Sequence, residues 1–180
     1  MKLLPISIIM ISMVFFQVQR PGTFNIFKSK KAGYVVNYPS DWFEIGSTNE
    51  LQIDSFPRER SVRGAVIPSD GAGIHILRPS QLPLNILPSN ITEWSKMQPQ
   101  RSREIRRRYL NLTGQKGNIS AIEVEQVQTC GEQICMRSIS IYFQLGGELF
   151  VGTVFFWDGN PKNDRYLEIL REIIRSLRLL

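Results

Sequence analysis

Residues 149–156 read Leu-Phe-Val-Gly-Thr-Val-Phe-Phe and are apolar at nearly every position. Successive side chains of a strand point to opposite faces, so a strand of this composition must be covered on both sides. The segment therefore predicts a layered fold, in which other elements pack above and below one central sheet.

The segments around it predict antiparallel neighbours. Gly146 and Gly147 are typical of a two-residue hairpin turn, which joins residues 136–145 to residues 148–157. A second tight turn, between Cys130 and Cys135, joins the same strand to the one before it. The other strands that we expect are residues 23–27, 34–38, 42–45, 51–56, 73–77, 109–112 and 119–128.

Two helices are predicted. Asn90, with Glu93 three residues later, is typical of a helix start, and this helix should end near Met97. Asn160 and Pro161 favour the start of a second helix, over residues 162–177. Its apolar residues recur at helical spacing on one face: Tyr166, Ile169, Leu170, Ile173, Ile174 and Leu177. The predicted class is α+β, with a central antiparallel sheet and a C-terminal amphipathic helix.

Residues 34–45 predict a sharp corner between two strands. Pro39 fixes its own φ and keeps Tyr38 out of the helical region. Trp42 then returns as a large apolar side chain. Tyr38 and Trp42 could surround a ligand, but a corner anchored in the core by aromatic rings is the interpretation we favour.

The N-terminus resembles a targeting segment. Lys2 precedes an apolar stretch over residues 3–18, and Arg20-Pro21-Gly22 ends it. We expect residues 1–20 to be a signal peptide or an uncleaved N-terminal anchor, followed by one domain over residues 21–180. Export to the periplasm or the extracellular space follows from this expectation.

Export permits a disulfide between the two cysteines, Cys130 and Cys135. Two free thiols are the alternative. Their spacing is not that of a zinc or redox motif, and His75, the one histidine, has no recognisable nucleophile or acid at a motif spacing. We therefore predict no metal, no cofactor and no catalytic residue.

The chain has a formal charge of +6, which favours anionic partners. Five arginines lie close together in the sequence: Arg101, Arg103, Arg106, Arg107 and Arg108. They are candidates for binding an anionic envelope component or an acidic protein face, and a solvated sheet edge is the alternative. Nucleic acid is not expected as a partner, because an exported protein rarely meets it and stacking aromatics are sparse here.

The order of these features resembles the PsbP-like family, named after an extrinsic subunit of photosystem II. The resemblance rests on Tyr38-Pro39-Ser40-Asp41-Trp42, on Phe56-Pro57 after a strand, and on Ser176-Leu177-Arg178 at the end of the last helix. It implies an α-β-α sandwich and a role in binding or assembly. No residue pattern carries over manganese or calcium handling, so a photosynthetic role is not implied.

The functional expectation is an exported, monomeric and non-catalytic binding or assembly module of the cell envelope. Its partner is an unknown protein or an anionic component, and it would contact a membrane only through an uncleaved leader. The alternatives are a hydrolase with its site in the proline-rich loops, and a small-ligand carrier with a pocket between sheet and helix.

Overall fold

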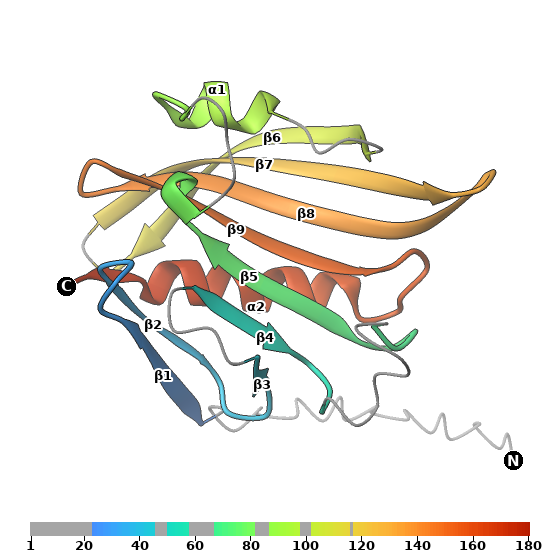
Figure 1. Cartoon of the computed structure of the whole chain (residues 1–180), viewed down its shortest axis with the longest axis horizontal. Helices are drawn as coiled ribbons and strands as arrows, with labels where there is room; N and C mark the ends of the chain where they lie inside the picture. Colours follow the sequence, from blue (N-terminus) through green and yellow to red (C-terminus); the bar gives the residue numbers. More distant parts are fainter. Residues whose placement is uncertain (1–22, 46–49, 58–66, 82–86, 98–101, 116) are drawn as a thin grey trace, which may run out of the picture.

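The computed structural model describes residues 23–45, 50–57, 67–81, 87–97, 102–115 and 117–180, and the predicted leader lies outside them. Within these ranges the chain forms two antiparallel sheets and two α-helices, α1 and α2 (Figure 1). The larger sheet has seven strands, in the spatial order β3 (Phe43–Glu44), β4 (Leu51–Asp54), β5 (Ala72–Leu77), β9 (Glu148–Trp157), β8 (Gln133–Leu145), β7 (Gly117–Cys130) and β6 (Ser102–Gly114).

The smaller sheet contains β1 (Phe24–Ser29), β2 (Tyr34–Pro39) and β10 (Arg178–Leu179), with β2 in the middle. The helix α2 (Asn163–Ser176) and this sheet pack on one face of the large sheet, and α1 (Ile91–Lys96) packs on the other (Figure 1). A short 3-10 helix, η2 (Pro79–Gln81), follows β5. The predicted α+β fold, with a central antiparallel sheet between helices, is confirmed.

The strand β9 lies in the middle of the large sheet and is buried on both faces, as its composition predicts. Phe150, Val154 and Phe156 join the main core on the α2 side, while Val151 packs in a second cluster under Trp94 of α1. The main core is the larger of the two, and it includes residues from both sheets and from α2.

Gly152 sets the distance between β9 and α2. A Cβ atom at this position would lie 2.9 Å from Cδ1 of Ile76, 2.9 Å from Cδ1 of Leu170 and 3.0 Å from Cδ1 of Ile174. These contacts are tighter than packed side chains normally show, so a side chain here would force these three side chains to shift. The space between helix and sheet is filled at this point. Nearer the start of α2, a hollow of about 340 Å³ lies between them, lined by Leu167 of the helix and by Glu125 and Phe156 of the sheet, among others.

The corner at Pro39 takes the chain from the small sheet to the large one. Trp42 is 5% exposed, and its ring meets that of Tyr166 in α2 edge to face, with centroids 5.7 Å apart. At the far end of β2, the Tyr34 hydroxyl donates to the carbonyl of Ile76 at 3.1 Å and accepts from the amide of Leu51 at 2.8 Å. Burial raises the pKa of this hydroxyl. The favoured interpretation of the corner as an anchor in the core agrees with this packing.

Three sequence predictions can be compared in detail. The helix α1 begins as predicted, because the Asn90 side chain accepts from the amide of Glu93 at 2.8 Å. The helix α2 begins at Asn163, one residue after the predicted start: the Asn160 side chain accepts from the amide of Lys162 at 2.9 Å, as a residue at a helix start does, and it also donates to the carbonyl of Gly71 at 3.0 Å. The strand predicted over residues 109–112 is also too short, since β6 pairs with β7 from Ser102 onward.

The predicted disulfide is confirmed. Cys130 and Cys135 are bonded across the β7–β8 hairpin, with their Cα atoms 5.6 Å apart. Their backbones stand at a separation that suits a bridge. The bond closes the tip of the hairpin farthest from the main core.

We expect Trp42→Ala to lower the free energy of unfolding by about 3–5 kcal/mol, because the substitution leaves a cavity where α2, β2 and β3 meet. Urea denaturation followed by circular dichroism measures the loss. The matched control is Phe43→Ala on the next residue, whose side chain is 45% exposed. An equal loss in both variants would contradict the anchoring role of Trp42.

Candidate functional site

The α1 side of the large sheet changes from apolar to polar along its strands. Residues paired across strands share a face, so the register arranges their side chains in rows. The row beneath α1 is apolar, and Trp94 of α1 lies over it, with its ring 5.6 Å from that of Tyr142. This row contains Leu77, Val151, Tyr142 and Ile122.

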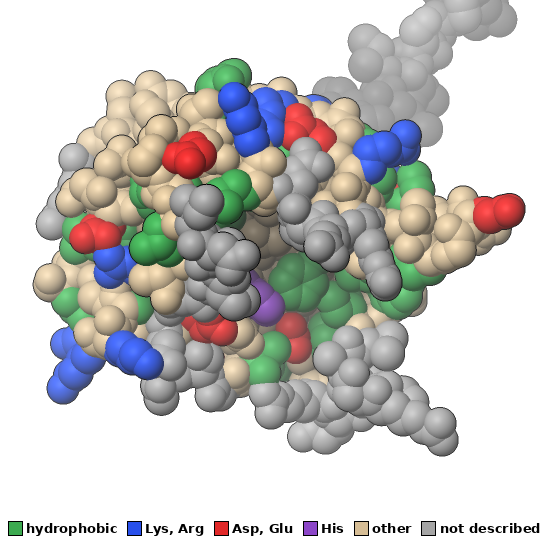
Figure 2. Space-filling model, turned by 45° about the horizontal axis from the view of Figure 1, so that its top comes forward, with side chains coloured by type: hydrophobic (Ala, Val, Ile, Leu, Met, Phe, Trp, Pro, Cys, Tyr) green, Lys and Arg blue, Asp and Glu red, His purple; other side chains and the backbone are tan. Residues whose placement is uncertain are grey.

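The rows beyond α1 are largely polar. The first contains Gln52, His75, Thr153, Ser140, Val124 and Arg107. The second contains Asp54, Gly73, Phe155, Ser138, Gln126 and Glu104. The third contains Trp157, Met136, Gln128 and Ser102. Figure 2 shows a hollow on this side of the molecule, with the single histidine at its base beside apolar side chains.

Gln126 is the most unusual residue of these rows. It is only 3% exposed, and within the described part of the chain its Nε2 atom has no hydrogen-bond partner. Gln126 lines a hollow of about 240 Å³, together with Ser102, Val127, Gln128, Met136, Arg137, Ser138 and Phe155. A buried donor without a partner costs about 1–3 kcal/mol of stability, which makes this residue a candidate for contact with a hydrogen-bond acceptor.

Phe155 forms an aromatic wall beside this hollow. Its ring lies across Gly73, where a Cβ atom would be 2.5 Å from Cε2 of Phe155. The His75 ring meets it edge to face, with centroids 4.7 Å apart. Burial lowers the pKa of His75 to about 4, so its imidazole is neutral at pH 7. The hydroxyls of Ser140 and Thr153 hydrogen-bond to each other at 2.9 Å.

Arg107 closes the β6 end of the same face. Its guanidinium donates to Glu104 Oε1 at 2.9 Å and Oε2 at 2.6 Å, and to the hydroxyl of Ser95 at 2.6 Å and its carbonyl at 3.0 Å. The hydrogen bonds to Glu104 hold the pKa of Arg107 above its ordinary value. Arg107 therefore ties α1 to the sheet and leaves the hollow without a free positive charge at this point.

The other arginines of the predicted cluster are separated by the alternation of β6. Arg106 and Arg108 face the α2 side, opposite to Arg107, where they pair with Glu125 and Glu123. Arg103 lies at the exposed start of the strand and has no ion-pair partner among the described residues, and Arg101 lies outside them. The structure thus divides Arg106, Arg107 and Arg108 between two faces and does not bring them together as one patch.

Sequence reasoning missed two buried carboxylates that use these arginines. Glu123 is 1% exposed and accepts from Arg108 of β6 and from Arg171 of α2, the latter at 2.7 Å. Glu125 pairs with Arg106 at 2.6 Å and with Arg137 at 2.7 Å. The sequence signal that could have identified Glu123 and Glu125 is their position in the predicted strand, where they alternate with apolar residues. In the structure both face α2.

The described residues contain no group of three or more His, Cys, Asp or Glu side chains that could hold a metal ion. Neither described helix is long and apolar enough to cross a membrane.

No protein-family model matches the sequence, and no curated protein is similar to it in sequence. Solved structures with a similar backbone fold include a protein of Bacteroides thetaiotaomicron, at 14% sequence identity and a TM-score of 0.48. The match covers 86% of this chain and 48% of that one, so the chain spans about half its length.

Two smaller proteins match over most of their length. Cyanobacterial PsbP of Synechocystis has 14% identity and a TM-score of 0.45, over 91% of this chain and 96% of its own. The Ran-binding protein Mog1p of Saccharomyces cerevisiae has 7% identity and a TM-score of 0.44, over 88% and 96%. The resemblance to PsbP-like proteins is thus a similarity of backbone fold at low sequence identity. It assigns no ligand or partner to this chain.

Glu123→Gln should destabilise the protein at neutral pH by about 2–3 kcal/mol, because it leaves Arg108 and Arg171 without their shared carboxylate. Burial alone would raise the pKa of Glu123, but the hydrogen bonds from Arg108 and Arg171 outweigh it and hold this pKa below its ordinary value. A depressed pKa in the folded state contributes stability above the ordinary glutamate range, and that contribution is lost as pH falls through the folded pKa.

The difference between wild type and Glu123→Gln should therefore shrink as the pH falls below about 4. Urea denaturation at a series of pH values measures it. Glu168→Gln is the control, because Glu168 is 48% exposed and pairs with Arg171 and Arg175 at the surface, where about 0–1 kcal/mol is expected. A difference for Glu123→Gln that does not change with pH would contradict the ion-pair role.

Proposed function

We propose that this protein is a non-catalytic binding module of the cell envelope, and that the hollow beside Gln126 binds an uncharged polar ligand or partner segment. The observation that carries the proposal is the buried Nε2 atom of Gln126, which has no hydrogen-bond partner among the described residues although Gln126 lines the hollow. An acceptor in the hollow would offset the cost of that donor.

The chemistry of the lining favours a ligand without net charge. Arg137 is the charged residue among those that line the hollow, and it pairs with Glu125 and Asp158. Ser138 and Gln128 offer further hydrogen bonds, and Met136 and Phe155 offer apolar contact. A few placed polar groups on an apolar wall are typical of small-ligand sites. Hydroxyl and amide oxygens, as in neutral sugars and peptide backbones, are the acceptors that fit this set.

A hydrolase is less well supported at this site. A general base works best when its pKa lies near the working pH, and burial lowers the pKa of His75 to about 4. The nearest hydroxyls across the strands, those of Thr153 and Ser140, hydrogen-bond to each other. The geometry therefore favours recognition over nucleophilic attack.

We also propose, as the sequence suggests, that arginines of this cluster bind an anionic partner. The structure changes which variant can test this role. Charge reversal of Arg106 or Arg108 would place a carboxylate against Glu125 or Glu123 and would destabilise the fold. Arg103→Glu is the informative variant, because this side chain is exposed at the start of β6. If Arg103→Glu no longer binds an anionic partner while its melting temperature is unchanged, the docking role of the arginines is supported.

Gln126→Leu tests the hollow directly. Replacing the amide by an apolar group of similar size should leave the free energy of unfolding unchanged or raise it by about 1–2 kcal/mol. The probes are neutral di- and trisaccharides and peptides blocked at both ends. We expect one class to shift the NMR signals of the Gln126 side-chain amide in wild type, and at least tenfold weaker binding in the variant.

Gln144→Leu is the matched control, since Gln144 is exposed on β8 and donates to the carbonyl of Gly147 at 3.0 Å. It should bind the probe as wild type does. Equal binding by Gln126→Leu and wild type, or destabilisation of Gln126→Leu by more than about 1 kcal/mol, would contradict the proposal, because the second result would mean that the amide is held by the fold itself.

A further inference from the structure

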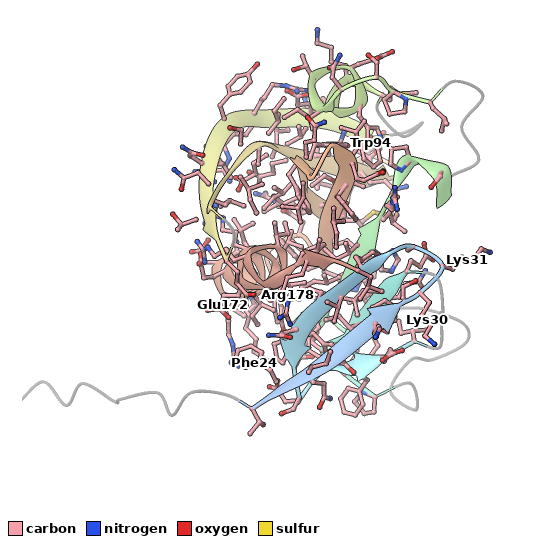
Figure 3. The ribbon with its side chains drawn as sticks, turned by 90° about the vertical axis from the view of Figure 1, so that its left-hand side faces the viewer. Phe24, Lys30, Lys31, Trp94, Glu172 and Arg178 are labelled. Atoms are coloured by element: carbon pink, nitrogen blue, oxygen red, sulfur yellow. A yellow bond between two sulfur atoms is a disulfide. The ribbon has the colours of Figure 1, made fainter. Side chains whose placement is uncertain are left out.

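The small sheet has one buried face and one face that is open to solvent. Phe27, Tyr34, Val36 and Tyr38 point into the main core. Strand pairing places the intervening residues on the opposite side, where Phe24 faces Pro39, Ile26 faces Asn37, and both Lys28 and Arg178 face Val35. We call these seven residues the outer face of the small sheet; Figure 3 looks toward it.

Large apolar side chains are exposed on this outer face. Phe24 is 50% exposed and Ile26 is 67% exposed, and they occupy neighbouring positions on β1. Val35 and Pro39 on β2 are partly exposed beside them. Phe24 also lines a hollow of about 400 Å³ with Asn37 and with polar residues of α2, among them Glu172 and Arg175. Adjacent exposed apolar side chains of this size mark an interaction surface.

Positive charge accompanies the apolar residues. Lys28 lies on the outer face, and Lys30 and Lys31 extend from the β1–β2 turn at its end (Figure 3). All three are exposed, and none has an ion-pair partner in the described ranges. Arg178 adds a fourth cation, and Glu172 of α2 is an acidic side chain that borders this surface near Phe24 (Figure 3).

We propose that the outer face of the small sheet docks on an anionic lipid bilayer. Apolar side chains that enter the interface, together with basic side chains at the headgroups, are the combination that such membrane surfaces bind. Each lysine near an anionic surface adds to this attraction. Pairing of a second copy through this face would bring its cations together, which disfavours self-association.

The position of the face along the chain fits this occupant. The apolar stretch of the sequence ends at Val18, and β1 begins at Phe24. Residues 19–23 span at most about 18 Å when extended, so a leader held in a bilayer would keep Phe24 near its surface. This inference does not depend on the hollow beside Gln126. The hollow lies on the α1 side of the large sheet, and α1 and the small sheet lie at opposite ends of the molecule (Figures 1 and 3).

Labelling of single sites on the full chain tests the proposal. An environment-sensitive fluorophore is attached to Ile26→Cys, and to Tyr109→Cys as the control. Tyr109 is 76% exposed on β6, at the opposite edge of the large sheet from β3. The native cysteines are bonded to each other and do not take the label. The probes are vesicles of phosphatidylcholine alone, or of equal parts phosphatidylcholine and phosphatidylglycerol.

We expect the label at position 26 to shift to the blue and brighten severalfold on the phosphatidylglycerol vesicles only, while the label at position 109 stays in water. Lys28→Glu, Lys30→Glu and Lys31→Glu together should abolish the change without altering the melting temperature. A label at position 26 that stays in water, or that responds as the one at position 109 does, overturns the proposal. The proposal is also overturned if the label at position 26 responds equally on vesicles of phosphatidylcholine alone, or if its response persists after the three lysines are changed to glutamate.

Discussion

The contact between α2 and β9 at Gly152 is the constraint on which the rest of the structure depends. Because the helix lies directly on the strand there, Leu170 and Ile174 reach Ile76 on the neighbouring strand β5. The remaining area on this side of the sheet is left to the small sheet, which Tyr34 and Trp42 join to the large sheet and to α2. One close contact thus decides which elements share the main core.

The same helix explains why arginines gather on β6. Glu123 and Glu125 lie on the α2 side of β7, where water is largely excluded, and a buried carboxylate is tolerated only with cationic partners. Arg108 and Arg171 supply them for Glu123, and Arg106 and Arg137 for Glu125. The positive charge of this edge is therefore mostly matched inside the fold. The lysines of the small sheet are not matched in this way among the described residues.

Most of the fold could be predicted from local sequence patterns, because these patterns report burial. The apolar run of β9, the glycine turn after β8 and the spacing of α2 each follow from one short segment. The hydrogen bond from Asn160 to Gly71 could not, since the two residues lie far apart in sequence. The candidate site was missed for the same reason: Gln126 becomes unusual only when the register sets it beside Ser138 and Phe155.

The two surfaces that remain without a partner in the described structure differ in chemistry. The hollow beside Gln126 offers neutral hydrogen-bonding groups and an aromatic wall, which select a ligand by geometry more than by charge. The outer face of the small sheet offers exposed apolar side chains and lysines, which suit a broad anionic surface and require little geometry. Because the main core separates them, a protein held at a membrane by one surface keeps the other open to its ligand.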